Sequence, residues 1–292
     1  MKYLKKTAAG MLIFSVFLIG ILTILGTDRL ASVYREVDAM EEAVKLPILM
    51  YHSVVKDTSK AGEYIIDIQQ VKQDILYLKE RGYETVSVSD VIQYVNDEGE
   101  LPEKPVMLTF DDGFYNNYLY VYPVLQETGS CAVISIVGAF SEEFSKSGQK
   151  NEYGSYLTYD MMREMEASGL VEIGNHSYDF HSLDKRKGCL RKRGENAEVY
   201  KSIFINDTMK VQELLLQNGV TTPRFYTYPF GILNGETEEY LAELGFECTL
   251  GCQEGINYIT KNPDCLYQLK RYNRGYGTSS EEWIGAVLRK ME

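Results

Sequence analysis

Histidine and positive charge are both scarce in this sequence. Of 292 residues only three are histidine, at positions 52, 176 and 181, so a function that needs several imidazoles must use nearly all of them. Thirty lysines and arginines face 42 aspartates and glutamates, which gives a formal net charge of −12. A nucleic-acid binder needs a basic face to meet phosphates. The composition therefore argues against nucleic acid as a partner.

The cysteines lack the spacing of a zinc knuckle. The five stand at positions 131, 189, 248, 252 and 265, and none has a partner in a C-x2-C pair. In an oxidising compartment the spacing allows one disulfide among the last three, and the odd count leaves at least one thiol unpaired. Internal repeats are also lacking. With 45% hydrophobic residues, the chain fits one large α/β domain plus an anchor better than two small domains.

One stretch near the N-terminus lacks charge altogether. Residues 8–26 contain no charged side chain and follow a tip, residues 1–6, that carries three lysines. Nineteen residues of helix span roughly 28 Å, close to the hydrocarbon core of a bilayer. The lysines predict a cytoplasmic tip, so we expect a single-pass protein of the cell membrane, with a transmembrane signal anchor at residues 7–26. A cleaved signal peptide is the alternative, but no convincing small-x-small cleavage site is present.

Beyond a polar stalk, residues 27–45, strand-like runs alternate with helical patterns through one extracellular domain, residues 46–292. Such alternation is typical of βα units around a largely parallel sheet. Strands are expected at residues 46–52, 85–88, 106–110, 131–137, 170–174, 224–228, 247–250 and 266–272. Helices are expected at residues 71–81, 89–95, 117–126, 158–167, 195–217, 236–244 and 280–290. The polar segment 140–156 is expected to be a long surface loop.

The apolar run at residues 106–110 ends at two adjacent carboxylates, Asp111 and Asp112, followed by Gly113. Successive side chains of a strand point to opposite faces, so the two acids can have different functions. One can hold a metal while the other accepts a proton. An ordinary Asp-Asp-Gly turn is the alternative interpretation.

Two of the three histidines, His176 and His181, lie five residues apart just after a predicted strand. Side chains with this spacing diverge by about 140° on a helix and face opposite sides of a strand. They can converge only if the segment is a bent loop. Two imidazoles and one carboxylate are the minimal ligand set for a catalytic zinc. Without Asp111 and Asp112, two unrelated loop histidines would be the better interpretation.

These residues carry a resemblance to a known family. Residues 109–113 match the T-F-D-D-G motif of the polysaccharide deacetylases of carbohydrate esterase family four, the NodB-homology domain. Residues 176–181 resemble its H-[ST]-x-x-(x)-H motif in the longer spacing, and residues 228–231 are similar to its R-x-P-Y-G segment. The resemblance extends from residue 46 to the C-terminus. It implies an α/β fold, a distorted (β/α) barrel of the polysaccharide deacetylase type, with its site at the C-terminal strand ends.

The resemblance also implies a role for each matching residue. Asp112, His176 and His181 would hold a divalent metal ion, zinc in first place and cobalt or nickel as alternatives. Asp111 would be the general base that accepts a proton from the attacking water. The backbone N–H of Phe230 would stabilise the tetrahedral oxyanion.

Aromatic rings near these motifs are candidates for binding the sugar. Tyr178 and Tyr228, together with the ring of Phe230, are expected to form a wall against one sugar face. Packing in the core is the alternative, because aromatic side chains are more often core than platform.

Two positions depart from the family pattern. Thr227 stands where the family has an arginine that orients the catalytic aspartate, and Arg271 or Arg274 is a candidate replacement. The family's last motif, L-x-H, has no match, because no histidine follows His181. The remaining imidazole is His52, which follows a tyrosine as it does in the branch resembling poly-N-acetylglucosamine deacetylases. We therefore expect His52 to protonate the leaving amine.

Three functions agree with these observations. The first is an N-deacetylase acting on N-acetylglucosamine units of an extracellular polysaccharide, poly-N-acetylglucosamine or peptidoglycan. The second is an O-acetyl xylan-type esterase. The third is a catalytically weak glycan-binding module, which has no need of the complete Asp-Asp-His-His set. The sequence predicts no oligomeric state. A basic run at residues 185–187 and 191–193 is either a solvated face or a site for an anionic envelope polymer.

Overall fold

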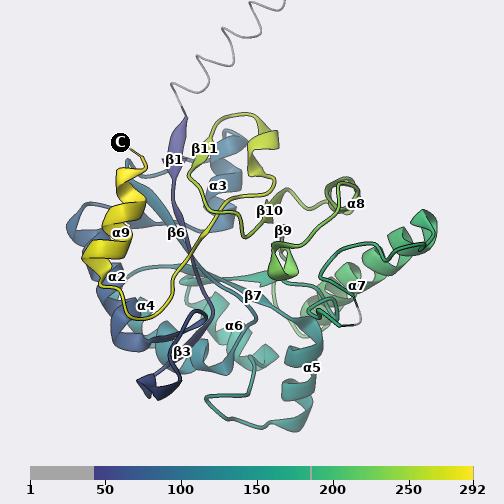
Figure 1. The fold of residues 1–292 in the computed structure, drawn as a ribbon, viewed down its shortest axis with the longest axis horizontal. Coiled ribbons are helices and arrows are strands. Elements are labelled where there is room, and N and C mark those ends of the chain that lie inside the picture. Colours follow the sequence, from purple (N-terminus) through teal and green to yellow (C-terminus); the bar gives the residue numbers. More distant parts are fainter. Residues whose placement is uncertain (1–42, 185, 292) are drawn as a thin grey trace, which may run out of the picture. The chain divides into compact units, whose positions relative to one another are not determined.

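The computed structural model describes residues 43–184 and 186–291 (Figure 1). The expected tip and transmembrane anchor, and all but the end of the expected stalk, lie outside these residues. Among the described residues no helix has the length and apolarity to cross a membrane. The folded unit begins at Val44, two residues before the boundary expected from the sequence. The reason is that strand β1 (Val44–Leu46) pairs with strand β11 (Asn257–Ile259), an antiparallel contact over a long sequence separation.

A curled parallel sheet forms the centre of this unit (Figure 1). Its order is β10-β9-β8-β7-β6-β2-β12, with β5 beside β6, and each of these pairings is parallel. An isolated parallel bridge joins Leu250, at one edge, to Leu269, which precedes the strand at the other edge. The strands are β2 (Ile48–Tyr51), β5 (Glu84–Thr85), β6 (Pro105–Phe110), β7 (Ala132–Ile136), β8 (Val171–Asn175), β9 (Phe225–Thr227), β10 (Cys248–Leu250) and β12 (Tyr272–Asn273). The α/β class with a parallel sheet is confirmed, in the form of a curled half-barrel.

Helices alternate with the strands and pack around the sheet. Their ends follow local chemistry: Ser87 forms a capping box with Asp90 at the start of α3, and Asn196 accepts two backbone N–H groups at the start of α7. The helices are α2 (Ile68–Glu80), α3 (Val88–Val95), α4 (Tyr122–Thr128), α5 (Gly138–Ser147), α6 (Tyr159–Ala167), α7 (Ala197–Gln217), α8 (Thr237–Glu243) and α9 (Ser280–Arg289). A π-helical turn (Asn117–Val121), three 3-10 turns (Thr58–Lys60, Pro229–Gly231 and Pro263–Leu266) and the parallel pair β3 (Ser53–Val55) and β4 (Ile65–Asp67) complete the unit.

The core explains why β6 is apolar apart from Thr109. All six of its residues are buried, and the Phe110 ring stacks on Tyr51 of the adjacent strand with centroids 4.9 Å apart. Strands covered on both faces read as continuous apolar runs. Burying one such large side chain contributes about 1.5–3 kcal/mol. The strand is thus fixed by its core packing, which fixes the place of the two carboxylates that follow it.

Several elements differ from the sequence prediction. The strand expected at residues 85–88 is only β5 (Glu84–Thr85), and α3 already begins at Val88. The expected loop 140–156 is helical in its first half, as α5, because Phe140 and Phe144 lie one turn apart and both pack on Tyr156. The polar composition of the segment hid this spacing. The last strand, expected at residues 266–272, is only Tyr272–Asn273 and follows the 3-10 turn Pro263–Leu266. All five cysteines are free thiols, so the disulfide that the spacing allowed is not formed.

Candidate active site

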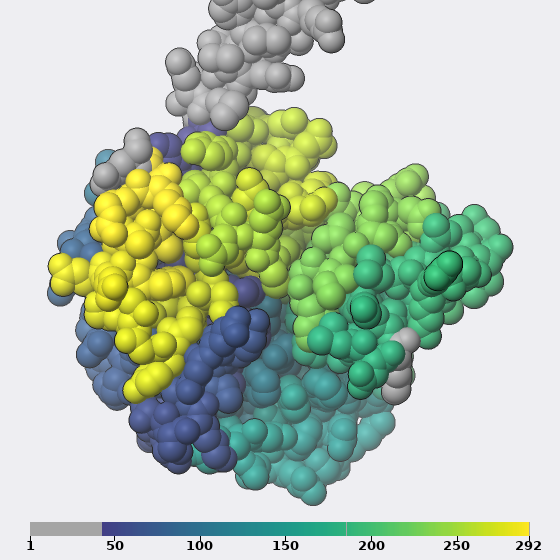
Figure 2. All heavy atoms as spheres, in the orientation of Figure 1, coloured from purple at the N-terminus to yellow at the C-terminus, as the bar shows by residue number. Residues whose placement is uncertain are grey.

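Several of the predicted site residues directly follow strands of the parallel sheet. Asp111 follows β6, His52 follows β2 and His176 follows β8. Because the carboxyl ends of parallel strands meet at the same edge, side chains from distant parts of the chain converge there. On the face seen in Figure 2, the blue segment after β2 lies beside the yellow segment near the C-terminus, with green segments across from them.

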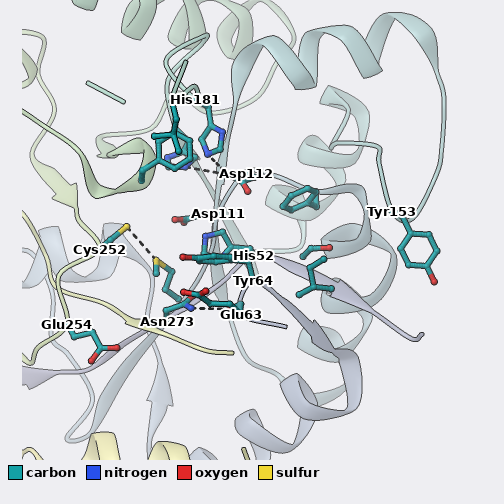
Figure 3. A pocket seen from close by; sticks show the side chains of 17 residues that line it. His52, Glu63, Tyr64, Asp111, Asp112, Tyr153, His181, Cys252, Glu254 and Asn273 are labelled. Carbon is teal, nitrogen blue, oxygen red and sulfur yellow. Dashed lines mark hydrogen bonds and ion pairs between the residues drawn. The ribbon is translucent and has the colours of Figure 1, made fainter. Parts of the chain in front are cut away.

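The convergence encloses a cavity of about 720 Å³ (Figure 3). It is lined by Met50, His52, Ser53, Glu63, Tyr64, Ile65, Asp111, Asp112, Phe114, Tyr153, His176, His181, Leu183, Phe230, Cys252, Glu254 and Asn273. Six of the ten site residues named from the sequence therefore line one cavity. They are His52, Asp111, Asp112, His176, His181 and Phe230.

Asp112, His176 and His181 form a group with the donor set of a metal centre. Their ligand atoms all lie within 4.8 Å of one another. Asp112 Oδ1 is 3.0 Å from His181 Nε2 and 3.5 Å from His176 Nε2, yet it makes no well-formed hydrogen bond within the described residues. Burial raises the pKa of Asp112, but the two histidines outweigh burial and lower that pKa below its usual range. The carboxylate is therefore ionised and faces both ring nitrogens.

The tautomer of His176 fits the same interpretation. Its Nδ1 lies 2.7 Å from the carbonyl oxygen of Thr227, which can only accept a hydrogen bond. Nδ1–H therefore donates to that oxygen, and Nε2 on the other side of the ring faces Asp112. A backbone carbonyl behind the ring is the usual way in which a metal-binding histidine is oriented. The residues present thus fit a divalent cation.

The bent loop that brings the two histidines together is held by α7. Asp207 on that helix accepts the backbone N–H of Tyr178 and of Asp179, both at 2.8 Å. At the start of the bend, Ser177 has a left-handed φ of 69°, and its N–H donates to the Asn175 side chain at 2.9 Å. Burial raises the pKa of Asp207 to about 6. The sequence predicted the bend but not the carboxylate that holds it, since position 207 lies in an ordinary helical pattern.

Arg271 binds Asp111 through two parallel hydrogen bonds. The distances are 2.7 Å to Oδ1 and 2.8 Å to Oδ2, and both side chains are buried. The guanidinium also donates to the carbonyl of Gly251 at 2.7 Å. Burial raises the pKa of Asp111, but the charge and hydrogen bonds of Arg271 together with the neighbouring His176 and His52 outweigh burial and lower that pKa. The carboxylate is therefore ionised, and the two-point contact fixes its plane.

Arg274, the other candidate, has a different partner. It pairs with Asp74 of α2 at 2.8 and 3.1 Å, and both side chains are fully buried away from Asp111. Of the two arginines left open by the sequence, only Arg271 lies on the aspartate.

His52 lies across the cavity, and Figure 3 places Asp111 between it and the Asp112–His181 pair. The ring packs edge-on against Tyr64 with centroids 4.9 Å apart. Its Nδ1 is buried and has no hydrogen-bond partner among the described residues. Burial lowers the pKa of His52. A ring nitrogen without an internal partner is free to exchange a proton with a ligand.

Phe230, whose backbone N–H is the candidate oxyanion donor, lies in a tight turn with a strained backbone. Its φ is 58°, in the left-handed region, and its ring lies over His181 with centroids 4.4 Å apart. The next residue, Gly231, has φ 64°, and a Cβ there would come within 2.6 Å of Cys252. The turn is therefore locked against the segment that follows β10.

The prediction of an aromatic wall is wrong for Tyr178 and Tyr228. Tyr228 is fully buried in a separate aromatic cluster. Tyr178 packs under the ammonium of Lys210 and donates to Glu142 at 2.7 Å. Neither ring lines the cavity. Tyr228, after β9, packs into the core, and Tyr178, in the histidine loop, packs against α5 and α7. The aromatic rings that do line it are Tyr64, Phe114, Tyr153 and Phe230. Their loop positions carry no periodic signal by which the sequence could have marked them.

Comparison with known protein families assigns this α/β domain to a class of hydrolases. The family model for polysaccharide deacetylase matches residues 98–249, more than half of the sequence. The chain belongs to the polysaccharide deacetylase family.

Individual relatives agree with this assignment. The chain is 25% identical over 229 residues to the poly-beta-1,6-N-acetyl-D-glucosamine N-deacetylase of Escherichia coli, covering 71% of this chain and 34% of that protein. It thus spans about a third of that relative's length. The enzyme of the same name from Staphylococcus epidermidis is 24% identical over 245 residues, covering 82% of this chain and 80% of that one.

Solved structures share the fold. A de-N-acetylase from Aggregatibacter actinomycetemcomitans superposes with a TM-score of 0.68 at 25% identity, over 84% of this chain and 99% of that one. IcaB from Ammonifex degensii gives a TM-score of 0.66 at 24% identity, over 84% and 97%.

Proposed function

We propose that this protein is a metal-dependent deacetylase that hydrolyses the N-acetyl groups of N-acetylglucosamine units in an extracellular polysaccharide. The observation that carries the proposal is the joint placement of the Asp112, His176 and His181 ligand atoms beside an arginine-held Asp111. A pure binding module gains nothing from an ionised, oriented aspartate next to a three-donor cation site. The names of the relatives support the same bond as the target.

The metal would be held by Asp112, His176 and His181, with zinc proposed ahead of cobalt or nickel because two imidazoles and a carboxylate suit it. A bound divalent ion supplies polarisation of the acetyl carbonyl and a lowered pKa of the attacking water. The protein supplies the orientation of His176 through the Thr227 carbonyl.

The remaining steps belong to side chains of the cavity. Asp111 accepts a proton as the water oxygen attacks the acetyl carbonyl carbon, and Arg271 keeps its carboxylate in one plane during that transfer. The backbone N–H of Phe230 is proposed to bind the oxyanion that forms. As the carbon–nitrogen bond breaks, His52 donates a proton to the nitrogen. The products are acetate and a glucosamine amine. Because burial lowers the pKa of His52, its protonated form is a stronger acid than an exposed imidazolium.

The substrate polymer is proposed to lie outside the cell, as poly-N-acetylglucosamine or peptidoglycan. The support for this location is the charge pattern of residues 1–26, which favours a membrane anchor with a cytoplasmic tip. The domain would then act at the outer surface of the membrane.

Acetate release tests the proposal. The purified protein is incubated with β-1,6-linked and β-1,4-linked N-acetylglucosamine oligomers and, separately, with acetylated xylan. We expect release from the N-acetylated oligomers, loss of release after chelation, and recovery on adding zinc. Faster release from xylan would support an O-acetyl esterase instead. Saturable oligomer binding without acetate release, with zinc bound, would support a glycan-binding module.

A further inference from the structure

The chain between His181 and α7 carries concentrated positive charge at residues 183–184 and 186–195, here named the basic loop. These residues include five basic and two acidic side chains, whereas the whole chain carries a net charge of −12. The loop encloses a second cavity of about 250 Å³. That cavity is lined by Leu183, Asp184, Arg186, Lys187, Leu190, Arg191, Lys192 and Arg193.

Arg186 stabilises the basic loop, whereas three other basic side chains of the loop are exposed and can bind an anion. Arg186 is buried and donates twice to Glu195, at 2.7 and 2.8 Å, and once to the carbonyl of Leu190 at 2.9 Å. By contrast Lys187, Lys192 and Arg193 are exposed. Within the part of the chain that the structure describes, no carboxylate forms an ion pair with any of these three. Their charges are therefore available to an external anion.

The basic loop is joined to the catalytic cavity. Leu183 lines both cavities. Gly188, with a left-handed φ of 52°, approaches so closely that a Cβ there would lie 2.8 Å from the carbonyl oxygen of Pro229. The N–H of Cys189 donates to the carbonyl of Ile232 at 3.0 Å. The loop thus packs on the turn that carries Phe230, and a polymer leaving the catalytic cavity on this side meets its cations.

The second cavity is lined by five basic residues and one acidic residue. Carboxylates line the catalytic cavity, with Glu63 and Glu254 (Figure 3) in addition to Asp111 and Asp112. Opposite potentials on adjacent surfaces select a ligand whose own charges match them. A neutral acetamido group suits the first cavity, and a negative group a short distance along the same polymer suits the second.

From this arrangement we infer that the substrate is an anionic glycan. It carries carboxylate or phosphodiester groups that Lys187, Lys192 and Arg193 bind while an N-acetylglucosamine unit occupies the catalytic cavity. The inference rests on the proposed deacetylase function and narrows its substrate class. A neutral homopolymer gains nothing from the basic loop, and a deacetylated, cationic one is repelled by it.

The test compares two substrates that differ only in charge. Glycan strands of peptidoglycan, whose stem peptides carry carboxylates, are used as isolated and after their carboxylates are converted to amides. The triple variant Lys187→Gln, Lys192→Gln, Arg193→Gln is expected to lose about tenfold in kcat/KM on the charged strands, mostly through KM, from three exposed contacts of modest strength. On the amidated strands it should match the wild type. Raising the salt concentration should remove the difference between the two proteins, since exposed charges are screened.

A matched control variant changes two lysines and one arginine elsewhere. Lys79, Arg81 and Lys104 are exposed and lie ahead of β5 and β6, at the end of the sheet opposite the catalytic edge. Their replacement by glutamine should leave both substrates unaffected, which rules out a general effect of net charge.

Three outcomes would overturn the inference. One is an equal loss on charged and amidated strands, and another is no loss on either. The third is unchanged kinetics with weaker binding of phosphatidylglycerol vesicles, which would assign the basic loop to the membrane surface. Failure of the proposed function is separate, because the wild type would then release no acetate from any strand or from neutral oligomers.

Discussion

Removing the Arg271 side chain leaves the Asp111 carboxylate buried without its counter-ion. Both residues are at most 2% exposed, and their side chains meet through two hydrogen bonds of 2.7 and 2.8 Å. Breaking a buried pair from one side costs about 3–5 kcal/mol. We therefore expect Arg271→Ala to lower the free energy of unfolding by about that amount, a large part of the stability of an ordinary domain.

A more conservative substitution tests the orientation of the Asp111 carboxylate with a smaller effect on the stability of the protein. Arg271→Lys keeps the positive charge, but an ammonium cannot hold both carboxylate oxygens in one plane. The Asp111 carboxylate should then rotate away from the attacking water. Since a misplacement of about 1 Å can cost 10²-fold in rate, we expect kcat to fall by about 10²-fold while most of the protein stays folded at room temperature.

Arg274 provides the internal control. Its pair with Asp74 is equally buried and also two-pointed, with distances of 2.8 and 3.1 Å. Arg274→Lys should therefore cost similar stability but leave kcat within about threefold of the wild type, because Asp74 does not line the catalytic cavity.

Urea unfolding followed by tryptophan fluorescence gives the stability of each variant, and acetate release at saturating substrate gives kcat. Zinc content is measured alongside, to show that the cation site is retained. Wild-type kcat in Arg271→Lys would refute the orienting role. Equal kcat losses in the Arg271 and Arg274 variants would show that stability alone is responsible.

The other predictions concern single residues of the cavity and its support. His52→Ala should lower kcat by about 10²–10⁴-fold with full zinc content; wild-type turnover would exclude His52 as the acid. Asp111→Asn should also keep zinc and lose turnover, whereas His181→Ala should lose both, and zinc retained in full by the latter would contradict its role as a ligand. Asp207→Ala removes the acceptor of two backbone N–H groups behind the histidine loop. It should weaken zinc binding roughly 10–100-fold in a competition with a chelator, and unchanged affinity would show that the loop is held without it.

Much of the site could be predicted because it depends on local pattern. An apolar run that stops at Asp111 and Asp112 has few interpretations other than a buried strand ending at a functional edge. The spacing of His176 and His181 excluded both helix and strand, so the bend was the remaining geometry. The structure places these four residues in one cavity. Their roles remain predictions for the experiments above.

The rest depends on contacts that a sequence does not encode locally. Arg271 and Arg274 are three residues apart and chemically identical, and what separates them is which buried carboxylate lies opposite each. Asp74 is a charged residue on the apolar face of a helix, and it is fully buried; the sequence alone does not show which cation compensates it. Tyr228 follows a strand and borders a motif, yet its side chain turns into the core. Only the packing of distant elements decides such cases.

The replacement of the family's arginine by Thr227 leaves the histidine site intact for a physical reason. His176 uses the carbonyl oxygen of residue 227, which every amino acid supplies. The Thr227 hydroxyl meets Ser135 at 2.7 Å and does not reach Asp111. The guanidinium comes instead from the segment before β12, a strand that pairs with β2, which in turn pairs with β6. In this curled parallel sheet β9 and β12 lie on opposite sides of β6, and the long side chain of Arg271 reaches Asp111 from the segment before β12. An orienting charge can therefore enter from β9 or from β12, whereas a ligand loop anchored by backbone contacts must stay at β8.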